Sequence, residues 1–161
     1  MAKQNGIVVR RDLAPGVDLF LDPALLMYDV SVDAINLTQG MSEQTGNVVY
    51  YGELNARAEA QVAYYKQAVE ILEAQLIKDM RSVYAAKGDT KVSEVRLEKE
   101  VRLNPKMIEM QQRLRDAKYV HSLHLSVMDA FDHRRSMLIQ SAKTAIQSGY
   151  GDPSVRGVNS N

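Results

Sequence analysis

The sequence predicts an all-α protein built on one long antiparallel helical hairpin of the coiled-coil type. Composition is the first indication: the 161 residues include eight Met but only two Phe and no Trp, which favours a core of aliphatic helix faces over a β-sandwich. The second is a pair of long proline-free stretches in which apolar residues recur three and four positions apart, the spacing of an amphipathic helix. The third is the pair of dipeptides Asp22-Pro23 and Asn104-Pro105, each a capping side chain followed by proline at the first helical position.

A short helix is expected before the hairpin, beginning at Asp22-Pro23 and ending near Gln39. Its apolar residues recur at spacings of four and three and are Leu26, Val30, Ala34 and Leu37. Gly40 follows them as the predicted helix stop. Residues 1–21 contain two glycines and a proline and are expected to form a flexible N-terminal arm.

The first arm of the hairpin is predicted over residues 47–86. Its apolar line consists of Leu54, Ala58, Val62, Tyr65, Val69, Leu72, Leu76, Met80 and Val83. A helix of this length spans roughly 60 Å and needs a partner helix, because propensity alone does not stabilise it. The turn Lys87-Gly88-Asp89-Thr90 ends it.

A short, highly charged helix over residues 91–103 is expected to connect the two arms. Asn104-Pro105 then opens the second arm, which ends at Ser148-Gly149. Its apolar line consists of Met107, Met110, Leu114, Ala117, Leu125, Met128, Phe131, Leu138, Ala142 and Ala145 or Ile146. The arms should pack antiparallel, so that residues 22–149 form one hairpin domain and residues 150–161 form a disordered tail.

Familiar catalytic patterns are missing from the sequence, which has no glycine-rich phosphate loop, no GxSxG, no HExxH and no cysteine. We therefore expect neither an enzyme nor a cofactor. His121 and His124 are three apart on a helix, but we expect partly buried, hydrogen-bonded histidines here and not metal ligands. No stretch resembles a signal peptide or approaches ~20 apolar residues, so a cytoplasmic protein without a membrane partner is expected.

Two tyrosine pairs, Tyr50-Tyr51 and Tyr64-Tyr65, offer aromatic faces on which bases could stack. Adjacent helix positions point about 100° apart, so one ring of each pair can enter the seam while the other covers its flank. Packing is the favoured interpretation.

Positive charge is concentrated in one segment, although the formal net charge is zero. Residues 1–77 hold 5 basic and 10 acidic side chains, whereas residues 78–118 hold 11 and 7. The candidate nucleic-acid-binding residues in this segment are Lys78, Arg81, Lys87, Arg96, Lys99 and Arg102. An array of cations along one helix face suits a phosphate backbone. A solvated face with ion pairs such as Glu98–Arg102 and Glu109–Arg113 explains the same pattern, and spacing alone favours that alternative.

Residues 22–149 resemble the UvsY-type recombination mediators of tailed phages. The resemblance lies in the order of several features: a short helix opened by Asp22, a long helix with a basic and aromatic ending before Gly88, a last helix opened by Asn104-Pro105 and closed by Ser148-Gly149, and Arg134 four residues before Leu138. Val83-Tyr84 stands where the family often has two adjacent tyrosines.

The resemblance implies a non-catalytic protein that binds single-stranded DNA, forms ring-like homo-oligomers, contacts the recombinase and the single-strand-binding protein, and helps the recombinase to load. By position, it implies that Lys78 and Arg81 are the leading DNA contacts. The residues it implies for assembly are Phe131, Arg134, Leu138 and Ile146. The alternative function is a structural or chaperone-like helical hairpin, such as a virion component or a prefoldin-like clamp, with no nucleic-acid role.

Overall fold

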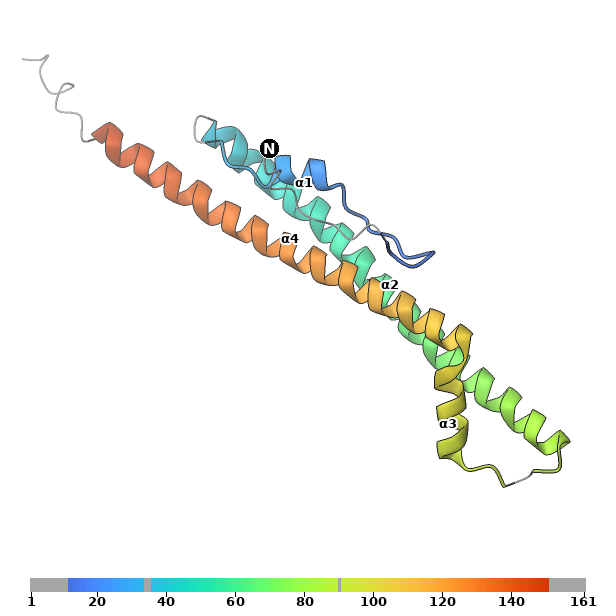
Figure 1. Cartoon of the computed structure of the whole chain (residues 1–161). Helices are drawn as coiled ribbons and strands as arrows, with labels where there is room; N and C mark the ends of the chain where they lie inside the picture. The colour runs from blue at the N-terminus through green and yellow to red at the C-terminus, as the bar shows by residue number, and fades with distance from the viewer. Residues whose placement is uncertain (1–11, 34–35, 90, 151–161) are drawn as a thin grey trace, which may run out of the picture. The chain divides into compact units, whose positions relative to one another are not determined.

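The computed structural model describes residues 12–33, 36–89 and 91–150. This part of the chain contains four helices and no strand (Figure 1). The helices are α1 (Pro23–Asp29), α2 (Leu37–Ala86), α3 (Glu94–Leu103) and α4 (Pro105–Tyr150). Helix α2 packs against α4. The predicted all-α class and helical hairpin are therefore confirmed, with one short helix before the hairpin and one connecting its arms.

Contacts between residues divide the chain into two compact units. Among the described residues, the first unit contains residues 22–33, 36–53 and 126–150. The second contains residues 12–21, 54–89 and 91–125. Helices α2 and α4 each contribute a part to both units, and each unit has its own core.

Tyr51 is the central aromatic residue of the first unit. Its side chain is 1% exposed, and its ring centroid lies 4.8 Å from that of Phe131 on α4. The Tyr51 hydroxyl donates a 2.9 Å hydrogen bond to Oδ2 of Asp29, the last residue of α1. Burial, together with this bond, raises the pKa of the phenol. Tyr51 therefore stays protonated and ties α1 to both long helices of this unit.

Helix α1 begins where the sequence predicts. The Asp22 carboxylate accepts from the amides of Ala24 and Leu25, which confirms Asp22 as the N-cap. The helix ends at Asp29 and does not reach Gln39. The β-branched residues that follow are poor helix formers, and the Ser31 hydroxyl bonds back to the Tyr28 carbonyl.

Gly40 lies inside α2, which begins at Leu37, and does not stop a helix. A Cβ built on Gly40 would lie 3.1 Å from Cδ2 of Leu138 on α4. The missing side chain at Gly40 therefore allows α2 and α4 to pack closely at this point. A glycine required by packing and a glycine that ends a helix have the same appearance in a sequence, which explains the misplaced boundary.

The second unit includes residues 12–21, which we call the strap. These residues belong to the segment expected to be a flexible arm, but they lie packed on the hairpin. Val17 is 8% exposed and shares a core cluster with Ala58 and Tyr65 of α2 and with Ala117 and Val120 of α4. The remainder of the predicted arm, residues 1–11, and residues 151–161 of the predicted tail lie outside the described residues.

Both tyrosine pairs divide as the packing interpretation predicts. In the first unit Tyr51 is 1% exposed and Tyr50 is 48% exposed, and in the second unit Tyr65 is 5% exposed and Tyr64 is 65% exposed. The two rings of each pair meet edge to face. One tyrosine of each pair is therefore part of a core.

The connection between α2 and α3 follows a helix-ending pattern. Gly88 has a φ of +81°, a left-handed conformation that glycine adopts at low cost. The Asp89 amide reaches back 3.0 Å to the carbonyl of Tyr84, as in a Schellman ending. Ser93 then caps α3, whose Leu97 and Val101 are each 1% exposed. The buried face of α3 holds this short helix within the second unit.

Candidate functional site

The predicted basic residues lie on α2, on α3 and on the turn between them, all within the second unit. All six side chains of the predicted set are exposed. On α3, the exposed residues Arg96, Lys99 and Arg102 are spaced three apart and so lie on one side of the helix. Leu97 and Val101 form its buried face. The helices therefore bring these cations to one end of the hairpin.

Each arginine of this set is paired with a glutamate. Arg81 Nη2 lies 2.5 Å from Oε1 of Glu94, which joins α2 to the first turn of α3. The other two pairs lie within α3 at i,i+4 spacing: Arg96–Glu100 at 3.2 Å and Arg102–Glu98 at 3.9 Å. The expected pairs Glu98–Arg102 and Glu109–Arg113 are both present. Exposed pairs of this kind add only ~0–1 kcal/mol to stability.

The lysines of the set differ from the arginines. Within the described parts of the chain, Lys78, Lys87 and Lys99 form no ion pair. Three ammonium groups at this end are therefore available to an external anion.

Tyr84, Arg96 and Glu100 form a small polar cluster between α2 and α3. The Arg96 guanidinium carbon lies 5.0 Å from the centroid of the Tyr84 ring. The Tyr84 hydroxyl donates to Glu100 Oε1 at 2.6 Å, and the same oxygen accepts from Arg96 Nε at 3.2 Å. These two donors lower the pKa of the Glu100 carboxyl, with the Tyr84 bond as the largest cause. The same bond raises the pKa of Tyr84.

This cluster is the part of the basic end that sequence reasoning missed. The i,i+4 spacing of Arg96 and Glu100 was visible, but Tyr84 belongs to another helix and no local pattern links it to them. A hydroxyl and a guanidinium that converge on one carboxylate oxygen can also converge on a phosphate oxygen. The cluster is thus chemically suited to an anionic ligand that displaces Glu100.

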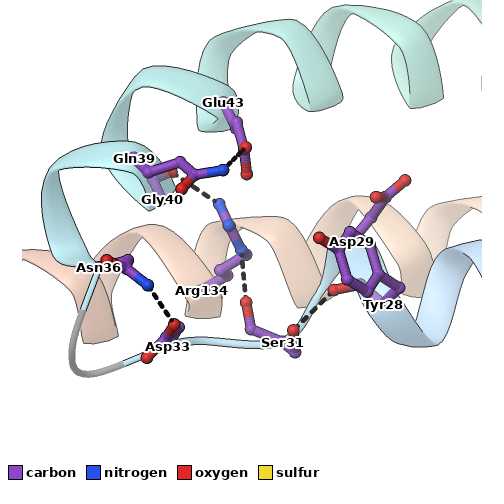
Figure 2. A pocket seen from close by; sticks show the side chains of 9 residues that line it. All are labelled: Tyr28, Asp29, Ser31, Asp33, Asn36, Gln39, Gly40, Glu43 and Arg134. Atoms are coloured by element: carbon purple, nitrogen blue, oxygen red, sulfur yellow. Dashed lines mark hydrogen bonds between the residues drawn. The ribbon is translucent and has the colours of Figure 1, made fainter.

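Arg134 forms the second polar centre of the structure, in the first unit (Figure 2). Its side chain is only 5% exposed. Nε donates to the carbonyl of Ser31 at 3.0 Å, and Nη1 donates to the carbonyl of Gly40 at 3.1 Å and to Oε1 of Gln44. These three hydrogen bonds fasten Ser31 and the first two turns of α2 to α4.

A cleft opens beside Arg134, and Figure 2 shows the side chains that line it. The lining residues are Tyr28, Asp29, Ser31, Asp33, Asn36, Gln39, Gly40, Glu43 and Arg134. Its three carboxylates are already engaged. Asp29 accepts from Tyr51, Asp33 from Asn36, and Glu43 from Gln39. The carboxylates of the cleft therefore already accept hydrogen bonds from neighbouring side chains.

The four residues implied in assembly do not all face outward. Phe131, Arg134 and Leu138 are 0%, 5% and 2% exposed, because they pack against α2 and the segment before it. Ile146 is 61% exposed. In this conformation Ile146 is the member of the set that a partner can contact directly, and the other three act on the fold of the chain itself.

His124 is hydrogen-bonded as expected, with its Nε2 3.0 Å from the carbonyl oxygen of Leu19 in the strap, but it is fully buried where partial burial was expected. His121 is partly buried. Within the described residues, no group of three or more His, Cys, Asp and Glu side chains is arranged to hold a metal ion. Nor does any helix in this part of the chain combine the length and apolar character of a membrane span.

The chain matches no known family profile, no curated protein sequence and no solved structure.

Proposed function

We propose that this chain binds single-stranded DNA without sequence specificity through the basic end of its second unit, as a mediator that helps a recombinase to load. The observation that carries the DNA-binding part is the set of three exposed lysines, Lys78, Lys87 and Lys99, which have no ion-pair partner among the described residues. Cations of this kind attract the phosphate backbone irrespective of base sequence.

The three arginines beside these lysines support the proposal in a second way. Arg81 and Arg102 are each held by an exposed carboxylate, and Arg96 by the half-buried Glu100. An exposed ion pair between two side chains contributes little free energy. When a DNA phosphate binds the arginine instead, condensed counterions are also released from the nucleic acid, which favours binding. A DNA phosphate can therefore displace these carboxylates.

The mediator part rests on the resemblance to UvsY-type proteins, which implies a recombinase and a single-strand-binding protein as partners and a ring of subunits. A ring would compensate for a modest site. A patch of a few cations binds with a Kd of roughly 10⁻⁴ to 10⁻⁶ M at physiological salt, and alignment of several patches raises the affinity through avidity. Exposed Met137, Ile139 and Ile146 on α4 provide apolar surface on which subunits can meet.

A structural or chaperone-like hairpin is the second candidate function. It is favoured by the ion pairs of Arg81, Arg96 and Arg102, which are what a solvated charged face would contain. This function needs no free cations, so loss of the three lysines would leave it intact.

The two candidates are separated by titrating the full chain onto fluorescent single-stranded DNA at several salt concentrations. The test variant carries Lys78→Ala, Lys87→Ala and Lys99→Ala. The matched control carries Lys66→Ala, Lys118→Ala and Lys143→Ala, the same charge change at three exposed positions outside the predicted set.

We expect steep salt dependence in the natural chain. The test variant should bind at least about tenfold more weakly, with the logarithmic salt slope reduced by about 2, as expected for loss of three phosphate contacts on a single strand. The control should change far less. Absence of binding at low salt, or equal losses in both variants, rejects the DNA-binding proposal. Recombinase loading onto DNA covered by single-strand-binding protein then tests the mediator role separately.

A further inference from the structure

The strap is recognised by α2 chiefly through its backbone. Gln61 makes two hydrogen bonds to one strap residue: its Oε1 accepts from the Asp18 amide at 2.8 Å, and its Nε2 donates to the Asp18 carbonyl at 3.1 Å. The Tyr65 hydroxyl donates to the carbonyl of Gly16. Such contacts resemble the binding of a peptide ligand more than the packing of two helices.

Helix α4 binds the strap through two buried side chains. Asp116, 1% exposed, accepts from the Ala14 amide at 2.9 Å, and His124, 0% exposed, donates through Nε2 to the Leu19 carbonyl at 3.0 Å. Release of the strap would deprive the buried Nε2 of His124 of its partner, which is costly. Asp116 would lose the Ala14 amide but keep the 2.9 Å bond from Nε2 of Gln112. An empty strap site is therefore unfavourable chiefly because of His124.

The apolar anchor of the strap is Val17. It lies among Ala58, Tyr65, Ala117 and Val120. A four-residue turn ends at Val17. The Val17 amide donates to the Ala14 carbonyl at 3.1 Å, and Gly16 within the turn has a φ of +84°. The strap thus carries its own anchor and its own backbone contacts, so it can dock without the rest of the chain to which it is attached.

The strap is joined to α1 by a strained connection. Phe20 has a φ of +60°, the one positive φ of a residue other than glycine among the described residues. A side chain with a Cβ adopts this conformation at a cost. Two residues later, Asp22 caps α1, and between them the chain passes from the second unit to the first. Release of the strap would allow Phe20 to relax.

We propose that the strap is exchanged between two copies of this chain, so that residues 12–21 of each copy occupy the strap site of the other. The exchanged segment has the same sequence as the segment it replaces, so the contacts of Ala14, Gly16, Val17, Asp18 and Leu19 with the strap site can be made again, while the chain changes direction at Phe20. Relief at Phe20 favours the exchanged form, and the buried His124 disfavours a form with an empty site. Exchange of one element is a low-cost route to a dimer. This proposal is independent of DNA binding.

The test uses the lack of any cysteine in the natural chain. One full-length chain carries Asp18→Cys in the strap. A second carries Ala60→Cys, an exposed position beside Gln61, whose side chain holds the Asp18 backbone. The two chains differ in tag mass, are unfolded together, refolded as a mixture and treated with a short bis-maleimide. Because each chain carries only one cysteine, a cross-link between positions 18 and 60 joins two different chains and gives a heterodimer of distinct mass.

The matched control replaces the second chain with one carrying Ala74→Cys. This alanine is also exposed and lies on the same helix in the same unit, but about 21 Å further along it. Exchange predicts at least about tenfold more heterodimer with Ala60→Cys than with Ala74→Cys. Addition of Val17→Asp to the strap chain should reduce this product by at least about tenfold, because a carboxylate would replace a buried methyl pair. The milder Val17→Ala should reduce it partly while the helical circular dichroism signal is retained.

A single chain carrying both Asp18→Cys and Ala60→Cys calibrates the result. If it cross-links within itself while the mixture gives no more heterodimer than the Ala74→Cys control, the strap stays in its own chain and the proposal is rejected. A heterodimer yield that is unchanged by Val17→Asp also rejects it, and so does a doubly substituted chain that gives no cross-link of either kind.

Discussion

Gly40 of α2 lies so close to Leu138 of α4 that a Cβ on the glycine would stand 3.1 Å from Leu138 Cδ2. Leu138 is 2% exposed, so its side chain has little space into which to move. The Gly40 carbonyl also accepts from Arg134. Helix packing in the first unit thus depends on the absence of a side chain at this position.

Gly40→Ala should therefore destabilise the protein by about 1–2 kcal/mol, despite a gain in helix propensity of up to ~1 kcal/mol. The matched control is Gly46→Ala, in the same helix and the same unit, where a Cβ would have no neighbour within 4 Å. That substitution should stabilise by about 0.5–1 kcal/mol. Urea unfolding followed by circular dichroism measures both. Stabilisation by both substitutions would show that Leu138 yields easily.

Arg134→Met should destabilise the first unit by about 1–3 kcal/mol. The substitution removes hydrogen bonds from a charged donor, partly offset because a buried cation no longer has to be desolvated. Its local effect should be faster amide hydrogen exchange in residues 30–33, which the Arg134 bond to the Ser31 carbonyl holds in place. Arg135→Met, at the adjacent exposed position, should change stability by less than about 0.5 kcal/mol. Equal effects of the two substitutions would contradict a specific role for Arg134.

The parts of the fold that could be predicted from sequence are those fixed by nearby residues. The hairpin arms follow from apolar spacing, and the cap at Asp22 depends on contacts two or three residues away. The end of α2 is similar, because Gly88 can adopt a positive φ without help from the rest of the chain.

The parts that could not be predicted depend on partners distant in sequence. The strap is bound through its backbone and through Val17, and apolar residues in so short a segment form no helical or strand repeat that would report its docking. Arg134 binds the carbonyls of Ser31 and Gly40, and a backbone carbonyl leaves no sequence signal. At the basic end the cations could be located by counting, but the contact of Tyr84 with Glu100 connects two helices and required the structure.

His124 should make stability depend on pH. Burial lowers the pKa of this imidazole from its usual 6.5. The neutral form is therefore favoured in the folded state, so its contribution to stability is fully present above about pH 6.5 and is lost as pH falls from there toward the lower folded-state pKa. The hydrogen bonds of His124 agree with a lowered pKa. Nε2 is bonded to the Leu19 carbonyl, whereas a proton added at Nδ1 would be buried with no acceptor to receive its hydrogen bond.

The measurement is the free energy of unfolding in urea between pH 7.5 and about pH 5. His124→Gln retains a donor for Leu19 but cannot titrate, so its stability should fall less steeply than that of the natural chain. The control His133→Gln changes an exposed histidine and should retain the natural slope. Identical slopes in all three proteins would exclude His124 as the source of the dependence.

Glu100 should lower the affinity of the proposed site for DNA, because its carboxylate already accepts hydrogen bonds from both Arg96 and the Tyr84 hydroxyl. Glu100→Gln removes the negative charge while retaining size, so it should raise affinity for single-stranded DNA about three- to tenfold at low salt, with a smaller gain at high salt. The matched control is Glu109→Gln. Glu109 also pairs with an arginine at i,i+4 spacing, Arg113 at 2.7 Å, but lies outside the predicted set. Both substitutions remove one negative charge, so an equal gain from both would reflect net charge alone. A larger gain from Glu100→Gln that disappears with Tyr84→Phe would locate the effect in the cluster itself.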